Sequence, residues 1–173
     1  MKKIGFGGGC HWCTEAVFQS LIGVDKVMQG YVASKEDESF FSEGVIIEFD
    51  SAIISIDVLI EIHLLTHKST SDHSMRAKYK SAIYTFSDCQ KEEVKNVMEI
   101  LKKNSKATII TEITPFHQFK ISRPEIQNYY YSNPEKPFCQ MYIDPKIRVL
   151  QTKFSKQLNQ EKITHLLEAN EKS

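Results

Sequence analysis

The stretch Gly7-Gly8-Gly9-Cys10-His11-Trp12-Cys13-Thr14-Glu15 joins a short apolar segment, residues 3–6, to residues 14–21, whose apolar positions have helical spacing. Glycine adopts backbone angles that other residues avoid, so three in a row predict a sharp turn between a strand and a helix. A cysteine directly before a helix lies beside free backbone N–H groups and the positive end of the helix dipole. Both favour the thiolate, so Cys10 is predicted to have a lowered pKa and to act as a nucleophile.

Outward from this turn, the apolar pattern alternates between strand and helix spacing. Strands are predicted at residues 3–6, 24–32, 45–49, 81–86 and 108–113. Helices are predicted at residues 14–21, after a capping Asp57, at 88–103 and at 124–131, with a loop at 34–39. The order strand, helix, strand, strand, helix, strand is that of a ferredoxin-like split βαβ core. The predicted fold class is therefore α/β (α+β), with an extra strand and C-terminal helices added to that core.

Length and charge limit the classes of protein. The 173 residues fit one catalytic domain, with a core at about residues 3–147 and a peripheral helix at about 155–170. Lys plus Arg and Asp plus Glu are 22 each, and this balance argues against electrostatic binding of nucleic acid or membranes. Apolar runs are far shorter than the roughly 20 residues that cross a bilayer, and the N-terminal one is too short for a signal peptide. A cytoplasmic monomer is expected.

Four cysteines in a cytoplasmic chain are typically redox-active, catalytic or metal-binding. Cys13 follows Cys10 by three residues, so on a helix both face the same side. This spacing leaves three interpretations open: a dithiol that closes to a disulfide, half of a zinc site, or chance. Zinc needs further ligands at short spacing. The remaining candidates are isolated or irregularly spaced: Cys89, Cys139, His63, His67 and His73.

The turn and the first helix together carry a family resemblance. Residues 9–12 resemble the Gly-Cys-Phe-Trp signature of the A-type peptide methionine sulfoxide reductases. Further similarities follow in the family's order over about residues 7–146. They are Cys13-Thr14-Glu15-Ala16-Val17-Phe18, Gly23-Val24, Gly30-Tyr31, Ser42-Glu43, Tyr79-Lys80-Ser81-Ala82-Ile83-Tyr84, Asn133-Pro134 and Pro137-Phe138-Cys139-Gln140. An ordered series of this kind is far more specific than any one of its members.

The resemblance implies thiol-dependent reduction of methionine S-sulfoxide, free or in a protein, to methionine. It implies that Cys10 attacks the sulfoxide sulfur and becomes a sulfenic acid. Glu43, with its pKa raised by an apolar site, would donate a proton to the sulfoxide oxygen. Tyr31 and Tyr79 would donate hydrogen bonds to the same oxygen. Trp12 would form a wall of the pocket for the substrate's S-methyl group.

A second thiol is then expected to condense with the sulfenic acid, giving a disulfide that a thioredoxin-type reductant reopens. Cys139 matches the family's C-terminal cysteine, which lies on a mobile tail, and is the favoured resolving residue. Cys13 is the alternative, or a relay. The resemblance implies no metal and no cofactor.

The chain also departs from the family pattern. His11 stands where the family has Phe, which makes one wall of the substrate site polar and titratable. Residues 32–41 replace a long Gly-rich loop, Ser74 stands at the place of an aspartate, and Phe138 stands where many members have Tyr. Two other functions remain open: a zinc-binding module that uses Cys10 and Cys13, and a general dithiol oxidoreductase that uses this pair alone.

Overall fold

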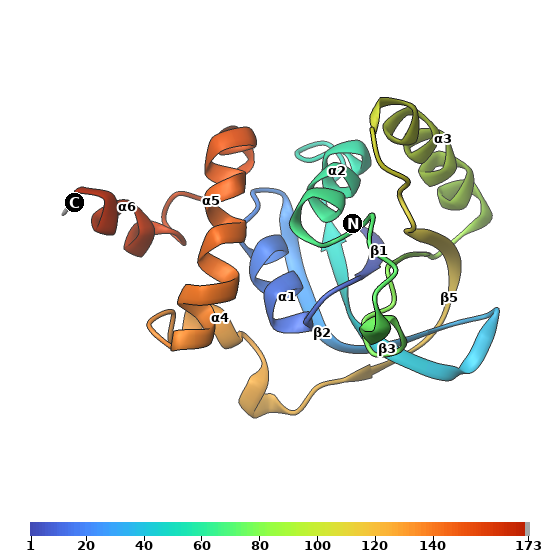
Figure 1. The fold of residues 1–173 in the computed structure, drawn as a ribbon, viewed down its shortest axis with the longest axis horizontal. Coiled ribbons are helices and arrows are strands. Elements are labelled where there is room, and N and C mark those ends of the chain that lie inside the picture. Colours follow the sequence, from blue (N-terminus) through green and yellow to red (C-terminus); the bar gives the residue numbers. More distant parts are fainter. Residues whose placement is uncertain (172–173) are drawn as a thin grey trace.

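The computed structural model describes residues 1–171, so the last two residues of the predicted domain, 172 and 173, lie outside it (Figure 1). The strands within this range are β1 (Lys2–Gly7), β2 (Val24–Ser34), β3 (Asp37–Phe49), β4 (Ala82–Thr85) and β5 (Glu112–Ile121). The α-helices are α1 (His11–Gln19), α2 (Ile56–Thr66), α3 (Asp88–Asn104), α4 (Tyr129–Ser132), α5 (Asp144–Lys153) and α6 (Thr164–Glu171).

The strands form one closed sheet in the order β1-β3-β2-β5-β4, with β4 also paired to β1. β3 lies between β1 and β2 and is antiparallel to both, which is the predicted split βαβ arrangement. β5 is the predicted extra strand: it runs parallel to β4 and antiparallel to β2, and thereby closes the sheet. The predicted mixed α/β fold with an extra strand and C-terminal helices is confirmed.

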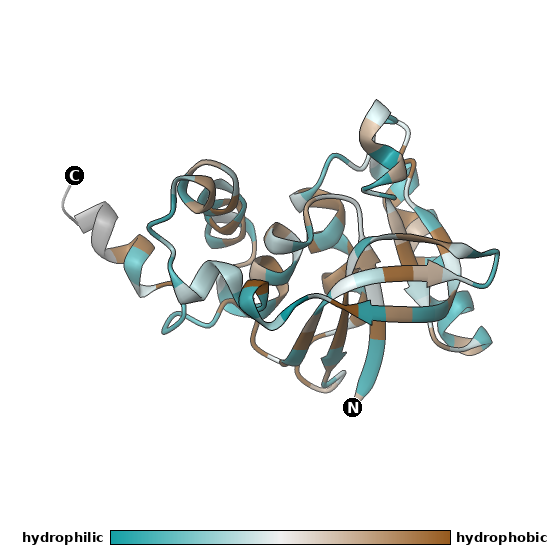
Figure 2. Ribbon diagram, turned by 90° about the horizontal axis from the view of Figure 1, so that it is seen from below, coloured by the Kyte–Doolittle hydropathy of each residue, from teal (hydrophilic) through white to brown (hydrophobic). Residues whose placement is uncertain are grey.

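The two faces of the sheet have different neighbours, because successive side chains of a strand point to opposite faces. One face packs against the helices and carries Phe6, Val45 and Ile47 in the main core. The other face holds a smaller cluster that includes Ile46 and Tyr84. Figure 2 shows the tip of the β2–β3 hairpin as hydrophilic. The side chain two positions before Val45 on β3 points to the same face as Val45, toward the start of α1. In this way β3 brings one of its side chains to the site.

Three boundaries predicted for the first half of the chain and for β5 are wrong. Residues 37–39 belong to β3 and not to a loop, because Ser34 pairs with Asp37 across a short turn. Ser55, and not Asp57, caps α2 by accepting the Val58 N–H. β5 covers Glu112–Ile121 instead of residues 108–113, since its second half, residues 116–121, pairs with β2. The periodicity identified these elements, but strand pairing decided where they end.

The C-terminal part also differs from the sequence prediction. The helix expected at residues 124–131 is two short turns, Pro124–Ile126 and Tyr129–Ser132, separated by Asn128 in a left-handed conformation (φ 54°). Buried side chains continue past residue 147 to Leu150 and Ile163. α6 is the helix within the peripheral segment expected at about 155–170. None of the helices described is long and apolar enough to cross a membrane.

The segment after α5 is attached to the far end of α1. Leu21 and Leu158 form an isolated antiparallel bridge. The Ile22 N–H donates to the Gln157 carbonyl oxygen at 2.7 Å, and the Asn159 N–H donates to the carbonyl oxygen of the residue before Leu21, also at 2.7 Å. The C-terminal segment thus packs against the helix that carries the cysteine pair.

Candidate active site

Cys10 lies at the N-terminal end of α1, directly after the glycine turn. Its carbonyl oxygen accepts hydrogen bonds from the N–H groups of Cys13 (3.1 Å) and Thr14 (3.2 Å), so it caps the helix. The side chain is half-buried. A hydrogen bond from the Cys13 thiol, supported by the N–H groups of Trp12 and Cys13, lowers the pKa of Cys10, whereas burial and the charge of Glu43 oppose this shift. The pKa of Cys10 is therefore lowered, as its position at the start of a helix predicts.

Cys13 lies one turn further along α1 and is buried, with 6% of its surface exposed. Its hydrogen bond to the Cys10 sulfur, together with burial, raises the pKa of Cys13. The positive charge of Lys146 acts in the opposite direction. Of the two sulfurs, Cys10 is therefore the one favoured as the thiolate and Cys13 the one favoured as the thiol.

The glycine turn is held by residues that are distant in the sequence. Gly8 has a φ of +150°, and a Cβ atom at this position would lie 2.4 Å from the His67 ring. Both observations require glycine here. Arg76 donates from one guanidinium nitrogen to the carbonyl oxygens of Gly8 (2.7 Å) and Tyr79 (2.9 Å). The Arg76 side chain therefore holds the glycine turn against the segment that carries Tyr79, a predicted site residue.

His63 and His67 stack behind this turn, with ring centroids 4.1 Å apart. His63 donates from Nε2 to the Gly7 carbonyl oxygen at 2.7 Å. His67 donates from Nδ1 to the His63 carbonyl oxygen and accepts at Nε2 from the Ser81 hydroxyl, 2.8 Å away. Burial lowers the pKa of His67 to about 4 and that of His63 well below its usual range. Both rings are neutral and serve the structure of the turn.

The neutral state of His67 predicts a loss of stability in acid. The unfolded chain takes up this proton near pH 6.5, whereas the folded chain takes it up only near pH 4. The free energy of unfolding is therefore expected to fall by about 2–3 kcal/mol between these pH values. Urea unfolding at a series of pH values measures this dependence. It should weaken in His67→Gln and persist in His117→Gln, which changes an exposed histidine of β5; equal dependence in both variants would contradict the prediction.

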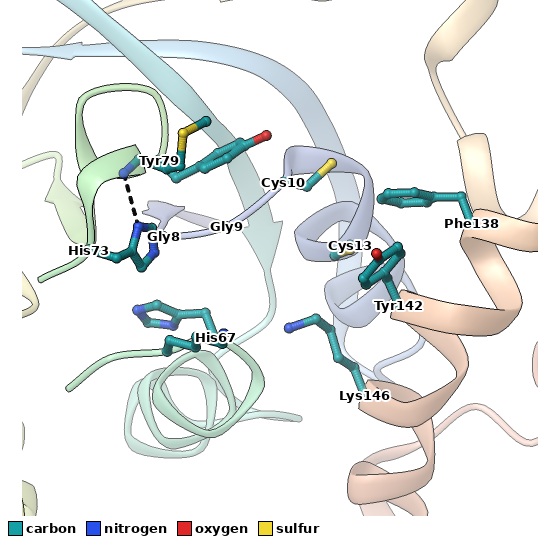
Figure 3. A pocket seen from close by; sticks show the side chains of 12 residues that line it. Gly8, Gly9, Cys10, Cys13, His67, His73, Tyr79, Phe138, Tyr142 and Lys146 are labelled. Carbon is teal, nitrogen blue, oxygen red and sulfur yellow. Dashed lines mark hydrogen bonds between the residues drawn. The ribbon is translucent and has the colours of Figure 1, made fainter. Parts of the chain in front are cut away.

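A cavity of about 320 Å³ opens in front of the two cysteines (Figure 3). Tyr79 lies on one side of Cys10, and Phe138, from the C-terminal part of the chain, lies on the other. Lys146 reaches from α5 toward the cavity and donates a hydrogen bond to the Thr66 carbonyl oxygen. Burial lowers the pKa of Lys146, while the cysteine charges raise it. The cavity therefore combines an apolar lining with a reactive sulfur, as small-ligand sites do.

Glu43 lies on β3, two residues before Val45 and opposite Tyr31 of β2. Its side chain is buried, and Oε1 accepts the His11 backbone N–H at 3.3 Å and lies 3.2 Å from His11 Nε2. Oε2 lies 3.5 Å from the Lys78 ammonium. The prediction that this carboxyl group lies in apolar surroundings is therefore wrong. Glu43 lies among polar partners, because the family's Phe is His11 in this chain.

Trp12 belongs to an aromatic stack beside the cavity. Its indole stacks on Tyr129, with centroids 4.1 Å apart, and meets the Phe138 ring edge-on at 5.4 Å. Buried Glu15 fixes Tyr129 by accepting its N–H at 3.1 Å and that of Asn128 at 2.9 Å. Burial raises the pKa of Glu15, and these hydrogen bonds oppose the shift. The Glu15 carboxylate on α1 thus positions the backbone of Tyr129, an aromatic residue that the sequence alone did not identify as part of the site.

Cys139 and Cys89 have contrasting environments. Cys139 is fully buried in the main core, at the start of a single wide helical turn, Cys139–Ile143. Burial raises its pKa. It does not lie on the mobile tail that the resemblance implies. Cys89 is exposed in the first turn of α3. No three His, Cys, Asp or Glu side chains within residues 1–171 are grouped so as to hold a metal ion.

The predicted site residues gather around the start of α1. Cys10, Cys13 and Tyr79 line the cavity. The other predicted residues do not line it: His11, Trp12, Tyr31, Glu43 and Cys139. The Tyr31 ring meets the His11 ring edge-on at 5.3 Å, which links β2 to the helix start.

Four residues that shape the site were missed by sequence reasoning: Arg76, Lys78, Tyr129 and Lys146. Lys78 directly precedes Tyr79, and Lys146 ends the matched section, so their positions were a usable signal. Arg76 acts on a carbonyl oxygen 68 positions away, for which the sequence holds no local signal.

The profile of a family described as peptide methionine sulfoxide reductase matches residues 2–159. The chain belongs to the peptide methionine sulfoxide reductase family. Two curated relatives are named peptide methionine sulfoxide reductase MsrA. That of Acinetobacter baumannii (strain AYE) is 32% identical over 168 residues, covering 89% of this chain and 96% of the relative. That of Psychrobacter sp. (strain PRwf-1) is 33% identical over 171 residues, covering 89% and 97%. The predicted family and enzyme class are confirmed.

Solved structures share the fold of this peptide methionine sulfoxide reductase. Reduced Mxr1 from Saccharomyces cerevisiae has a TM-score of 0.69 at 20% identity, covering 82% of this chain and 90% of that chain. Methionine sulfoxide reductase A of Corynebacterium diphtheriae has a TM-score of 0.63 at 23% identity, covering 77% and 75%. Mxr1 in complex with Trx2 has a TM-score of 0.55 at 20% identity, covering 74% and 84%. At these identities the likeness concerns the fold.

Proposed function

We propose that this chain reduces methionine S-sulfoxide, free or within a protein, to methionine, with Cys10 as the attacking thiolate. The observation that carries this proposal is the Cys10 sulfur itself, which has a lowered pKa and borders the cavity. The thiolate is the nucleophilic form of cysteine. Membership of the family supplies the reaction class.

Attack on a sulfoxide sulfur places negative charge on its oxygen, so the site needs a proton donor and hydrogen-bond donors there. Glu43 is assigned the role of acid, because its charge already acts on Cys10 and its Oε2 faces away from His11. Tyr79 in the cavity lining and Tyr31 opposite Glu43 are assigned as hydrogen-bond donors. The aromatic stack that includes Trp12 is assigned the role of packing against the S-methyl group of the substrate.

Loss of the acid is expected to slow the chemical step. Glu43→Gln should lower kcat/KM for methionine S-sulfoxide by about 10²–10⁴-fold, because an amide cannot deliver a proton. Stopped-flow measurement of the first turnover checks this. Glu48→Gln is the matched control, since Glu48 lies on the same strand and pairs with Lys3 at 3.6 Å. A Glu43→Gln rate equal to that of the control would remove Glu43 from the mechanism.

Cys13 is the resolving residue in this proposal, in place of the Cys139 favoured by the sequence comparison. Its thiol is already in hydrogen-bond contact with the Cys10 sulfur. Cys139 is fully buried and would have to leave the core. Condensation of the Cys10 sulfenic acid with the Cys13 thiol gives the disulfide and one water. Cys139 is assigned to a later step, in which its thiol attacks the Cys10–Cys13 disulfide, forms a new disulfide with one of these cysteines and releases the other as a thiol.

The reductant of the disulfide is proposed to be a thioredoxin-type dithiol, and the chain is proposed to act as a cytoplasmic monomer without metal. Mxr1, which shares the fold, has been crystallised with Trx2. The decisive assay supplies the purified chain with dithiothreitol and each sulfoxide epimer separately. Methionine should form from the S epimer only. Absence of product from both epimers would refute the function, and stoichiometric zinc in the purified protein would favour the metal-binding alternative.

A further inference from the structure

His11 is buried, with 3% of its surface exposed, and it immediately follows the proposed nucleophile. Its Nδ1 lies 2.8 Å from the Gly30 carbonyl oxygen. Its Nε2 lies 3.2 Å from Glu43 Oε1, and its backbone N–H donates to the same oxygen at 3.3 Å. The ring therefore bridges β2 and β3 directly behind the carboxyl group that is assigned as the acid.

These contacts fix the number of protons on the pair. A carbonyl oxygen can only accept, so Nδ1 of His11 carries a hydrogen and donates it to Gly30. Two states then satisfy the contact between Nε2 and Glu43. Either Nε2 also carries a hydrogen and the carboxyl is ionised, or Nε2 accepts a hydrogen from a neutral carboxyl. Both states contain one proton between His11 and Glu43, and groups coupled in this way titrate as a unit.

We propose that His11 is a positioning residue that stores, together with Glu43, the proton consumed in sulfoxide reduction; this inference rests on the proposed function. Lys78 at 3.5 Å and the backbone N–H both stabilise the ionised carboxylate. Among these partners, only His11 Nε2 can exchange a proton with the carboxyl group without losing its hydrogen bond to it. The imidazole keeps that proton within one hydrogen bond of the acid at neutral pH.

The reaction balances with this single proton. Thiolate, sulfoxide and one proton give the sulfenic acid and the thioether: the Cys10 sulfur gains the oxygen and is oxidised, and the substrate sulfur is reduced. Where the proton of the pair lies on His11 Nε2, it first passes to the Glu43 carboxylate. The carboxyl group then gives this one proton to the sulfoxide oxygen as the S–O bond breaks, and Glu43 is left as the carboxylate. His11 is left as neutral imidazole, and solvent restores the proton before the next cycle.

The surrounding titratable and charged groups define the expected pH dependence. Cys10 must be ionised, and the other hydroxyl groups of the site belong to Tyr31, beside the His11 ring, and to Tyr79 in the cavity lining. Lys78 remains charged, with its pKa raised by Tyr79 and Glu43. Cys10 and Lys78 are present both in the wild type and in a His11 variant, so a difference between the two pH profiles reports the proton of the pair.

The test compares pH profiles of first-turnover kcat/KM in the wild type, His11→Gln and His117→Gln. Glutamine cannot store a proton, so the ratio of wild-type to His11→Gln kcat/KM should rise at least about tenfold between pH 5 and 7.5. His117→Gln changes another histidine that faces a carboxylate, at 3.9 Å from Glu38 on the surface, and its ratio should stay constant. A constant ratio for His11→Gln, whatever its size, would reduce His11 to a structural role and overturn the proposal.

A second measurement does not depend on activity. In ¹⁵N NMR the His11 ring, identified by its disappearance in His11→Gln, should lose its proton at least about one pH unit lower in Glu43→Gln than in the wild type. An identical titration in both proteins would overturn the pairing even if the enzyme is active. A wild type without reductase activity would instead refute the proposed function, while the NMR titration still decides the pairing.

Discussion

The Cys10→Ser variant is expected to lose methionine S-sulfoxide reduction completely, by at least about a thousandfold in kcat/KM. Cys10 is the half-buried cysteine whose pKa is lowered at a helix start, and it borders the cavity. A serine hydroxyl at that point is not ionised at neutral pH and cannot be converted to a sulfenic acid. The loss should appear in the first turnover as well as in steady state, which separates attack from recycling.

Cys89→Ser is the matched control for this variant. Cys89 also lies in the first turn of a helix, α3, but it is exposed and remote from the cavity lining. Its activity should equal that of the wild type with either dithiothreitol or thioredoxin. Measurable first-turnover product from Cys10→Ser would show that another group attacks the sulfoxide, and the mechanism proposed for Cys10 would have to be abandoned.

The second large effect concerns recycling. Cys13→Ser should still form about one methionine per chain, because Cys10 attacks, Glu43 delivers the proton, and the serine hydroxyl can replace the Cys13 thiol as the hydrogen-bond donor to the Cys10 sulfur. Steady-state turnover with thioredoxin should then fall at least about tenfold, since the Cys10 sulfenic acid lacks its nearest partner. Mass spectrometry after one turnover without reductant should find the Cys10–Cys13 disulfide in the wild type.

Three outcomes distinguish the routes. If Cys139→Ser rather than Cys13→Ser stops thioredoxin-dependent turnover, Cys139 is the first resolving residue and must leave its buried turn. If Cys13→Ser loses the first methionine as well, the chain is a general dithiol oxidoreductase that uses Cys10 and Cys13 together. Retention of turnover in both variants would mean that the reductant attacks the sulfenic acid directly.

Most of the fold was predictable because its signals are local. The apolar segments and the glycine turn located β1, α1 and the strands that follow, and their order gave the split βαβ core. Element ends were not predictable, because they depend on pairing: β5 extends to Ile121 because its second half is hydrogen-bonded to β2. The closure of the sheet likewise depends on contacts between strands that are far apart in the sequence.

The features of the site likewise divide into those that the sequence predicts and those that depend on distant contacts. Cys10 and Cys13 carry their chemistry in adjacent sequence, and the lowered pKa of Cys10 follows from the hydrogen bond of Cys13, to which the N–H groups at the helix start add. The surroundings of Glu43 were not predictable, because His11 and Lys78 reach it from α1 and from the segment before Tyr79. The contact that changes an apolar wall into a polar partner therefore depends on three segments and could be seen only once they were folded together.

The bridge between Leu21 and Leu158 has a practical consequence for anyone who shortens the protein. A truncation after Lys153 would remove Leu158, Ile163 and Leu166, all almost fully buried. Each such side chain stabilises a fold by about 1.5–3 kcal/mol, so the sum approaches the whole stability of an ordinary domain, about 5–15 kcal/mol. A trimmed miniature of this reductase should therefore melt near room temperature, and purification tags belong beyond α6.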